Sequence, residues 1–284
     1  MSEGNVAADQ LRLFTTLRAD HDDRQLRKDH EKQLRAADPT RAPAPVYLGD
    51  DVAIDASSLS PDGRWLLVAT SAKGADAGRI GKLQKFVTES GYEEQEPERT
   101  RVGRNPPPAE SFKLVNLGDG SVADLSISAL PGIDDDPLAA LRKAAGKPPL
   151  TGHRALRAAA MQWSADGRQA ALELLSVDNK DRWIATVDFA GKSLRSAHRL
   201  SDPAWINSFA FSDFGWMPDN RTIWLLSEQS GYSHLYTVVP GQAARARNQG
   251  NWEASSPQFS ADGSRVWFVC NRKWPGGYEV CEEN

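Results

Sequence analysis

The chain has 284 residues, of which 40% are hydrophobic and 25% charged, and its formal net charge at pH 7 is -4. This length and composition are those of a globular protein with its own core, which excludes a disordered tail or a fibrous chain. The small acidic excess is the opposite of the basic footprint of a nucleic-acid binder. No apolar run is long enough to cross a membrane, and the first residues, MSEGNVAADQ, lack the pattern of a secretory signal. We therefore expect no nucleic-acid and no membrane partner, and the sequence leaves cytoplasmic, periplasmic and secreted locations open.

Residues 9–37 contain no glycine or proline and are rich in strong helix formers, so they predict a helix. Its apolar stripe is thin: Leu11, Phe14 and Leu17 follow helical spacing, and mostly charged residues come after them. The proline-rich stretch DPTRAPAP from Asp38 ends the helix, because proline removes a backbone donor and restricts the residue before it. We expect residues 1–45 to form a helical arm and linker, with the arm leaning on a partner surface.

From residue 46 to residue 284 the pattern changes to short β-type runs separated by Gly, Pro, Asp and Asn clusters, which is typical of an all-β protein. The clearest runs are residues 65–70, 111–117, 169–177, 183–189, 222–228, 234–239, 265–271 and 278–282.

Four similar stretches punctuate these runs: SPDGRWLL from Ser60, SADGRQAA from Ser164, MPDNRTIW from Met217 and SADGSRVW from Ser260. Such a tetrapeptide combines a capping side chain, an Asp that bonds the backbone ahead of it, and a Gly or Asn that accepts positive φ. Each stretch therefore predicts a hairpin corner that joins two antiparallel strands.

The corner spacings are 104, 53 and 43 residues, and a propeller blade takes roughly 40–50. The longest spacing leaves room for one more blade, whose hairpin we assign to residues 111–127. The sequence thus predicts a partial β-propeller of about five four-stranded antiparallel blades; a β-sandwich with repeated turns is the alternative. Residues 87–110 and 130–159 interrupt the repeat as insertions, and the second predicts a short helix over 137–145.

The two cysteines, Cys270 and Cys281, are too few for a disulfide framework or a cysteine zinc site. They are either small core hydrophobes or, if a hairpin joins them, a disulfide across adjacent strands. The acidic string Asp134–Asp136 lacks the alternating spacing of a calcium loop, so we expect no metal and no cofactor.

No Gly-x-Ser-x-Gly nucleophile elbow occurs in the chain, and the nearest string, GYSHL from Gly231, lacks the last glycine. We assign no catalytic residue for this reason. The five histidines, without a serine elbow, do not predict a triad: His21, His30, His153, His198 and His234. We expect His234 to pack or hydrogen-bond within its hairpin, and Trp224, Trp267, Tyr232 and Tyr236 to pack between blades.

The stretch FGWMPDNRTIWLLSEQSGYSHLYTV, residues 214–238, resembles the N-terminal β-propeller of the dipeptidyl peptidase IV branch of prolyl oligopeptidase family serine peptidases. VTESGYEE, DNKDRWIATVDF and GNWEASSPQFSADG resemble it too, and the likeness runs from about Tyr47 to Asn284. In that family the propeller covers a catalytic α/β-hydrolase domain and filters or holds the peptide substrate. The resemblance implies a non-catalytic fragment of such an enzyme, with a peptide and a hydrolase domain as partners. An incomplete propeller leaves strand edges unpaired, so we also expect the chain to associate with itself.

Peptidases of this branch hold the free amine of the substrate with two propeller glutamates, since an ammonium offers three donors and one positive charge. The matching pair here is Glu93 and Glu94, although solvated loop charge is the plainer interpretation. The alternative function is a free-standing propeller that binds a protein or peptide partner through its insertions.

Overall fold

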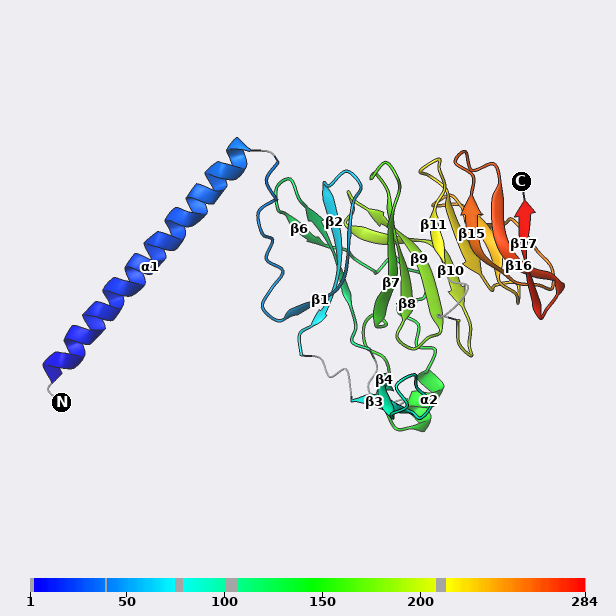
Figure 1. The fold of residues 1–284 in the computed structure, drawn as a ribbon, viewed down its shortest axis with the longest axis horizontal. Helices are drawn as coiled ribbons and strands as arrows, with labels where there is room; N and C mark the ends of the chain where they lie inside the picture. Colours follow the sequence, from blue (N-terminus) through cyan, green and yellow to red (C-terminus); the bar gives the residue numbers. More distant parts are fainter. Residues whose placement is uncertain (1–2, 39, 75–78, 101–106, 208–212, 284) are drawn as a thin grey trace. The chain divides into compact units, whose positions relative to one another are not determined.

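The computed structural model describes residues 3–38, 40–74, 79–100, 107–207 and 213–283 (Figure 1). The chain forms two compact units, which we describe separately: residues 1–47 with 117–120, and residues 48–116 with 121–284. In the first unit, helix α1 spans Glu3–Ala37, which confirms the predicted helical arm. Its apolar side chains are exposed within the chain, Leu11 by 69% and Phe14 by 62%. The partner surface for this helix remains a prediction.

The second unit is built from antiparallel sheets, which we number as blades 1 to 4. In each blade the strands follow one another in a meander, and the blades succeed one another along the chain. Blade 1 contains β1 (Val52–Leu59), β2 (Trp65–Ala72), β5 (Ser111–Asn116) and β6 (Val122–Asp124). Blade 2 contains β7 (Leu156–Trp163), β8 (Ala170–Ser176), β9 (Asp181–Asp188) and β10 (Ser193–Ser201). Blade 3 contains β11 (Phe214–Trp216), β12 (Ile223–Ser227), β13 (His234–Val238) and β14 (Arg245–Ala246); blade 4 contains β15 (Ala254–Phe259), β16 (Val266–Trp274) and β17 (Gly277–Glu283).

The all-β propeller class is confirmed, and the described residues form four blades where the sequence predicted about five. The difference lies in residues 111–127, which we had assigned to a blade of their own. In the structure β5 pairs with β2, for example Leu67 with Leu114, so this hairpin is the outer half of blade 1. The long first spacing therefore holds insertions and not an additional blade.

All four corners form hairpin turns between the first and second strands of a blade. In the first corner the Ser60 hydroxyl donates to Asp62 Oδ1 at 2.6 Å and accepts from the Trp65 amide at 2.9 Å. Gly63 adopts φ 68°, and Asn220 takes the equivalent place in the third corner with φ 56°. The local chemistry that predicted the corners is thus the chemistry that forms them.

Neighbouring corners and first strands are also bonded to one another. The Asp166 amide donates to Asn220 Oδ1 at 3.3 Å, which links the corners of blades 2 and 3. The Trp163 indole donates to the Ser58 carbonyl of blade 1, and the Trp216 indole donates to the Gln162 carbonyl of blade 2, each at 3.2 Å. In the fourth corner Gly263 lies against Met217 and Pro218 of the third corner, so the corners of all four blades lie at the same end of the sheets.

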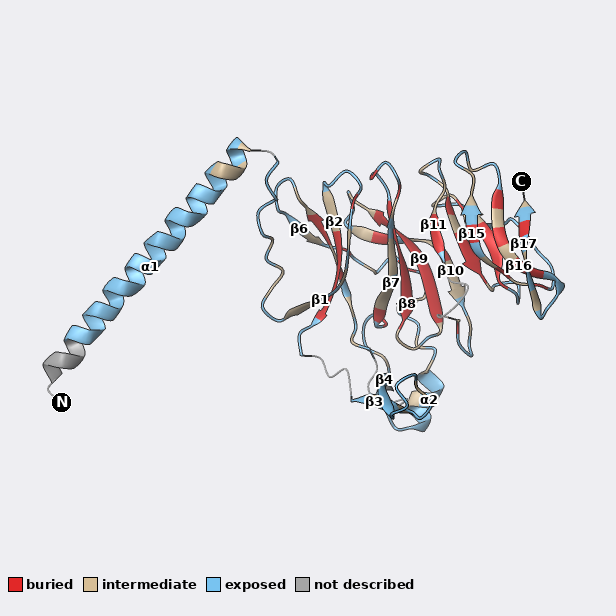
Figure 2. Ribbon diagram, viewed as in Figure 1, coloured by how far each residue is buried: buried red, intermediate tan, exposed pale blue. Residues whose placement is uncertain are grey.

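The cores lie between successive blades, as expected for repeats that cannot bury both faces alone. Figure 2 shows the buried residues concentrated on the blade strands. Blades 1 and 2 bury a cluster around Leu67, Leu172 and Trp183, while blades 3 and 4 share one around Trp252 and Phe268. Trp224 packs on Phe259 there, with ring centroids 5.7 Å apart, and Tyr236, 4% exposed, belongs to the cluster between blades 2 and 3.

The insertions contain regular structure of their own. Strands β3 (Ile80–Lys85) and β4 (Glu94–Thr100) form a two-stranded hairpin, so part of the predicted 87–110 insertion is a strand. Helix α2 (Ala139–Ala144) lies within the predicted 137–145 helix. Strand β7 already begins at Leu156, inside the range predicted as the second insertion. Among the described residues no helix combines the length and apolar character that crossing a bilayer requires.

Candidate functional site at the insertion end

The end of the blades opposite the corners carries the insertions, and we call it the insertion end. Because neighbouring strands are antiparallel, connections from second to third strands lie here, as do those from fourth strands to the next blade. The hairpin β3–β4 and helix α2 belong to these connections, and Figure 1 shows both at the lower edge of the picture. Connections of irregular length on a rigid scaffold are where binding residues concentrate.

Exposed aromatic side chains gather in the connections and strand ends of the insertion end. Trp205 is 62% exposed on the connection from blade 2 to blade 3, and Trp274 is 66% exposed at the end of β16. Phe86 and Tyr92 are 73% and 80% exposed near the tip of the β3–β4 hairpin. Tyr232, predicted to pack between blades, is 38% exposed here. Exposed aromatics of this size are typical of contact surfaces.

A dense set of hydrogen bonds holds the loop that carries Trp205. Asp202 Oδ1 accepts from the Trp205 amide at 3.1 Å, and the Asp202 amide donates to the Lys180 carbonyl at 3.0 Å. The Ile206 amide donates to the Asn179 carbonyl at 2.9 Å, and its side chain is buried. The Trp205 ring is therefore presented to solvent on a fixed backbone, which lowers the entropy cost of binding.

The predicted amine ligands lie on the β3–β4 hairpin and both are exposed. Glu93 Oε2 accepts from the Gln84 amide at 3.0 Å, and Glu94 Oε1 accepts from the Ser90 hydroxyl at 2.8 Å. Glu94 is the first residue of β4, so the pair lies at a strand boundary and not in a long loop.

A second group of carboxylates, which the sequence did not reveal, begins at Glu110. Glu110 Oε2 accepts from the Ala158 amide at 2.7 Å, where the register of β7 shifts by one residue. Burial raises the pKa of Glu110, and the nearby negative charge of Asp55 raises it further, while Arg157 opposes both. This carboxylate joins blade 1 to blade 2.

Glu173 and Arg182 continue this polar group toward blade 3. Glu173 is 4% exposed, and its Oε1 lies 3.6 Å from Arg182 Nη1 without a hydrogen-bond partner among the described residues. Burial raises the pKa of Glu173 to about 7, with Arg182 lowering it and Asp213 raising it. The buried Arg182 donates to the Leu226 carbonyl at 2.6 Å. We call Glu110, Glu173, Arg182 and the charged groups that act on them the seam. It contains more carboxylates than guanidinium groups: Asp55, Glu110, Glu173, Asp213 and Glu228 against Arg157 and Arg182.

A buried ion network fastens the second insertion to blade 2. Arg154 is 3% exposed; it contacts Asp178 through two nitrogens, at 2.7 and 3.0 Å, and Asp181 at 2.6 Å. Asp181 also accepts from Arg199 Nε at 2.6 Å, and both guanidinium groups lie over the Trp183 ring. The loop before β7 is thereby fixed against the turn between β8 and β9.

The blade histidines have partners other than serine. His153 Nδ1 lies 2.6 Å from Asp134, His198 Nε2 lies 2.9 Å from Gln229 Oε1, and His234 Nε2 lies 2.9 Å from the Gly250 carbonyl. His234 is buried against the edge of Trp252. These contacts give each imidazole a structural role.

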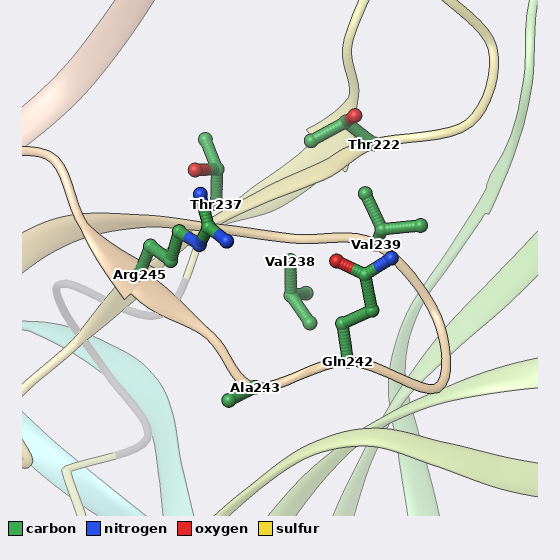
Figure 3. Close-up of a pocket in the computed structure, with 7 residues that line it drawn as sticks. All are labelled: Thr222, Thr237, Val238, Val239, Gln242, Ala243 and Arg245. Carbon is green, nitrogen blue, oxygen red and sulfur yellow. The ribbon is translucent and has the colours of Figure 1, made fainter.

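Two open cavities flank the turn between β13 and β14, away from these charged groups. One, of about 210 Å³, is lined on blade 3 by two threonines, Gln242 and Arg245 (Figure 3). The other, of about 550 Å³, is bordered by Arg195, Pro131 and Pro240. Each offers one guanidinium to an anionic group, but Arg195 already pairs with Asp188.

In blade 4 the structure joins Cys270 of β16 and Cys281 of β17 in a disulfide, with Cα atoms 6.0 Å apart. Both residues are buried, at 0% and 3% exposure, in the cluster shared with blade 3. The bond staples two neighbouring strands within the core.

The sequence reasoning missed most of the buried charges because it treats charged residues as surface. Arg154 meets Asp178 and Asp181 from 24 and 27 positions away, and no local pattern marks that pairing. The one signal was the string DNKDRW itself, whose second aspartate, Asp181, begins the buried strand β9.

Comparison with known proteins supports the resemblance found in the sequence. Residues 151–281, which include blades 2 and 3 and most of blade 4, match the family model described as the dipeptidyl peptidase IV (DPP IV) N-terminal region. A crystal structure of Porphyromonas gingivalis dipeptidyl peptidase 4 is similar in fold, with a TM-score of 0.56 and 15% identity over 80% of this chain. A putative dipeptidyl aminopeptidase IV from Bacteroides ovatus ATCC 8483 gives a TM-score of 0.49 and 12% identity over 79% of this chain. No curated protein sequence matches the chain.

The family-model match confirms the resemblance to the DPP IV N-terminal propeller, and the Porphyromonas gingivalis structure confirms the fold. The chain spans 28% and 33% of the two solved chains, so the activity of a whole enzyme is a separate question.

Proposed function

From this resemblance to the DPP IV N-terminal propeller, we propose that the chain is the non-catalytic propeller portion of a DPP IV-like serine peptidase. In this role it gates and binds the peptide substrate and docks on an α/β-hydrolase domain. The observation that carries the proposal is the family match over residues 151–281.

The insertion end is the proposed face for both tasks. Its connections carry exposed aromatic rings, and the β3–β4 hairpin adds the exposed carboxylates of Glu93 and Glu94. A peptide offers a matching set of groups, namely a cationic amino terminus and apolar side chains. The corners themselves are short turns closed by their own hydrogen bonds.

The test compares two versions of the protein on an Xaa-Pro-chromophore substrate. The 284-residue chain alone should release no chromophore, whereas a version extended by the coding sequence downstream of Asn284 should release it. Hydrolysis by the short chain would contradict the proposal. An extended version with no hydrolase motif and no activity would contradict it as well.

Glu93 and Glu94 are the proposed ligands of the substrate amine. In the extended, active version, Glu93→Gln with Glu94→Gln should raise KM for a substrate with a free amine and leave hydrolysis of an N-acylated analogue unchanged. Glu89→Gln, on the same hairpin, is the matched control. An unchanged KM in the double variant would show that Glu93 and Glu94 are solvated surface charges and do not bind the amine.

A free-standing interaction module is the second candidate, and the fixed, exposed Trp205 favours it. In that case the isolated chain should be a stable monomer that captures a peptide partner, and Trp205→Ala should weaken capture. Trp267→Ala, on a strand of blade 4, controls for the general loss of an indole.

A further inference from the structure

Three metal-ligand side chains meet on one face of blade 4. Cys270 pairs directly with Glu279 in the β16–β17 register, and Cys281 lies two residues beyond Glu279 on the same strand. Alternate residues of a strand point to the same face, so all three side chains share it. Their ligand atoms all lie within 4.8 Å of one another, and Glu279 Oε1 is 3.9 Å from Cys270 Sγ.

We propose that the reduced form of this cluster is a zinc site, in which the thiolates of Cys270 and Cys281 and the carboxylate of Glu279 bind one Zn²⁺ ion. A solvent molecule would take the fourth position. This inference concerns blade 4 alone and does not depend on the proposed peptidase role. Cysteine count and spacing had predicted no metal, because the third ligand comes from a register that the sequence does not show.

The distances in the cluster suit zinc. Zinc is bound by cysteine sulfur at about 2.3 Å and by carboxylate oxygen at about 2.0–2.2 Å in tetrahedral geometry. Two ligand atoms of such a site are then about 3.5–3.8 Å apart. The observed sulfur–oxygen separation of 3.9 Å is close to that value. The two sulfurs lie at bonding distance in the disulfide, so after reduction they must rotate apart to about 3.8 Å to share one zinc ion. A thiolate pair with one carboxylate also favours zinc over magnesium or calcium, which prefer oxygen alone.

The surroundings orient the carboxylate toward the sulfurs. Lys273 forms an ion pair with Glu279 Oε2, which leaves Oε1 facing Cys270. An outer partner of this kind fixes the direction of a metal ligand. The Glu279 side chain is 26% exposed, whereas both cysteines are buried, so solvent reaches the cluster from the Glu279 side.

Opening the site requires a reductant, because the structure holds the sulfurs as a disulfide. A water-soluble phosphine supplies two electrons: the S–S bond breaks, phosphorus is oxidised to the phosphine oxide with the oxygen of water, and the two protons of that water yield two thiols. Zinc then displaces both thiol protons and forms two Zn–S bonds, so that binding is tighter at higher pH.

The experiment uses the full 284-residue chain and the metal ions themselves. After phosphine reduction, titration with Zn²⁺ against a chromophoric chelator should give one zinc per chain, and the oxidised chain should bind none at this site. Co²⁺ added to the reduced chain should give the intense sulfur-to-metal charge-transfer absorption of a two-thiolate site. Absence of both signals in the reduced chain would overturn the proposal.

Substitution separates a built site from stray thiol binding. Glu279→Gln should weaken zinc binding by at least about tenfold, since even outer-shell changes at metal sites typically cost 10–100-fold. Glu282→Gln, exposed on the same strand and paired with Arg265, should bind zinc as the unchanged chain does. Equal affinity in the Glu279 variant would overturn the proposal. If reduction alone unfolds the chain, zinc must restore the circular dichroism spectrum, and failure to do so counts against the site.

Discussion

Folding buries the Glu173 carboxylate next to Arg182, which is too far away to form a hydrogen bond with it. Its charge loses hydration, and the Arg182 guanidinium at 3.6 Å offsets only part of that loss. The pKa of Glu173 therefore rises from an ordinary 4.5 to about 7. Since the folded-state pKa exceeds the unfolded one, its contribution to stability is complete below pH 4.5 and is lost as the pH rises through 7.

We predict that Glu173→Gln removes this pH dependence. Between pH 5 and pH 8 the unchanged chain should lose about 2–3 kcal/mol of unfolding free energy relative to the variant, at 1.36 kcal/mol per unit of pKa shift and with part of the loss already complete at pH 5. Urea denaturation at the two pH values measures the difference. Buried His198, whose pKa is lowered by burial, gives the opposite slope but contributes equally to both proteins. Glu282→Gln is the control, and parallel pH profiles for the Glu173 variant and the unchanged chain would refute the assignment.

The second residue-scale prediction concerns Arg154. Replacing it with methionine leaves Asp178 without its guanidinium partner and Asp181 with Arg199 alone, which should lower the unfolding free energy by about 3–5 kcal/mol. Arg195→Met, which breaks the solvent-screened pair with Asp188, should lower it far less.

Limited proteolysis gives the Arg154 prediction a local measurement. Trypsin should cut the variant faster after Arg142 and Lys143 in helix α2, because the insertion that carries them is no longer fastened to blade 2. If Arg154→Met and Arg195→Met lower the unfolding free energy by similar amounts, the buried Arg154 network contributes no more to stability than the exposed Arg195–Asp188 pair.

At the scale of elements, the corners invite a comparison between two glycines with the same conformation. Gly63 and Gly167 have φ of 68° and 69°, but an added Cβ meets nothing within 4 Å at Gly63 and lies 3.1 Å from Asp62 Cγ at Gly167. Gly63→Ala should cost about 1–2 kcal/mol from left-handed strain alone. Gly167→Ala should cost more, because the Asp62 side chain, which the Ser60 hydroxyl holds, must also shift. If the Gly63→Ala and Gly167→Ala variants unfold at the same urea concentration, the contact between the two corners has no effect on stability.

The same elements show how far the sequence reached. Corners and central strands follow from short-range chemistry, namely Asp and Gly in a tight turn and β-branched or aromatic runs, so the propeller class and most strands were predictable. Strand β4 was not, because EQEPERT carries charges where a strand usually alternates. The assignment of β5 to blade 1 depends on pairing across 40 or more residues of insertion, which no local pattern encodes.

The candidate site was less predictable than the fold. Glu93 and Glu94 were found through resemblance, and their role stays a prediction. Glu110 meets the Ala158 amide only because blade 1 packs against blade 2. Glu173 and Arg182 lie on the neighbouring strands β8 and β9 of blade 2, and the sequence does not show that this part of the blade is buried. Long-range packing, which decides whether a charged residue is buried, was the missing information.

At the scale of the whole molecule, self-association remains a proposal, and strand β17 is its most exposed candidate. In the described chain no strand pairs with its outer edge, and Tyr278 and Val280 are 65% and 74% exposed. Such an edge is a template for another strand. Val280→Lys should shift the sedimentation profile of concentrated protein toward monomer, whereas Val87→Lys on the β3–β4 hairpin should not. A monomer at every concentration for the unchanged chain would remove the proposal.

The indole-to-carbonyl bonds from Trp163 to Ser58 and from Trp216 to Gln162 pass from each blade only to the one before it. No single one of these bonds holds more than two blades together. Pulling residues 48 and 283 apart in an optical trap should therefore detach the blades in separate rupture events. Each event would release one blade's length of chain, and the disulfide in blade 4 would shorten its own step by the residues between the two cysteines.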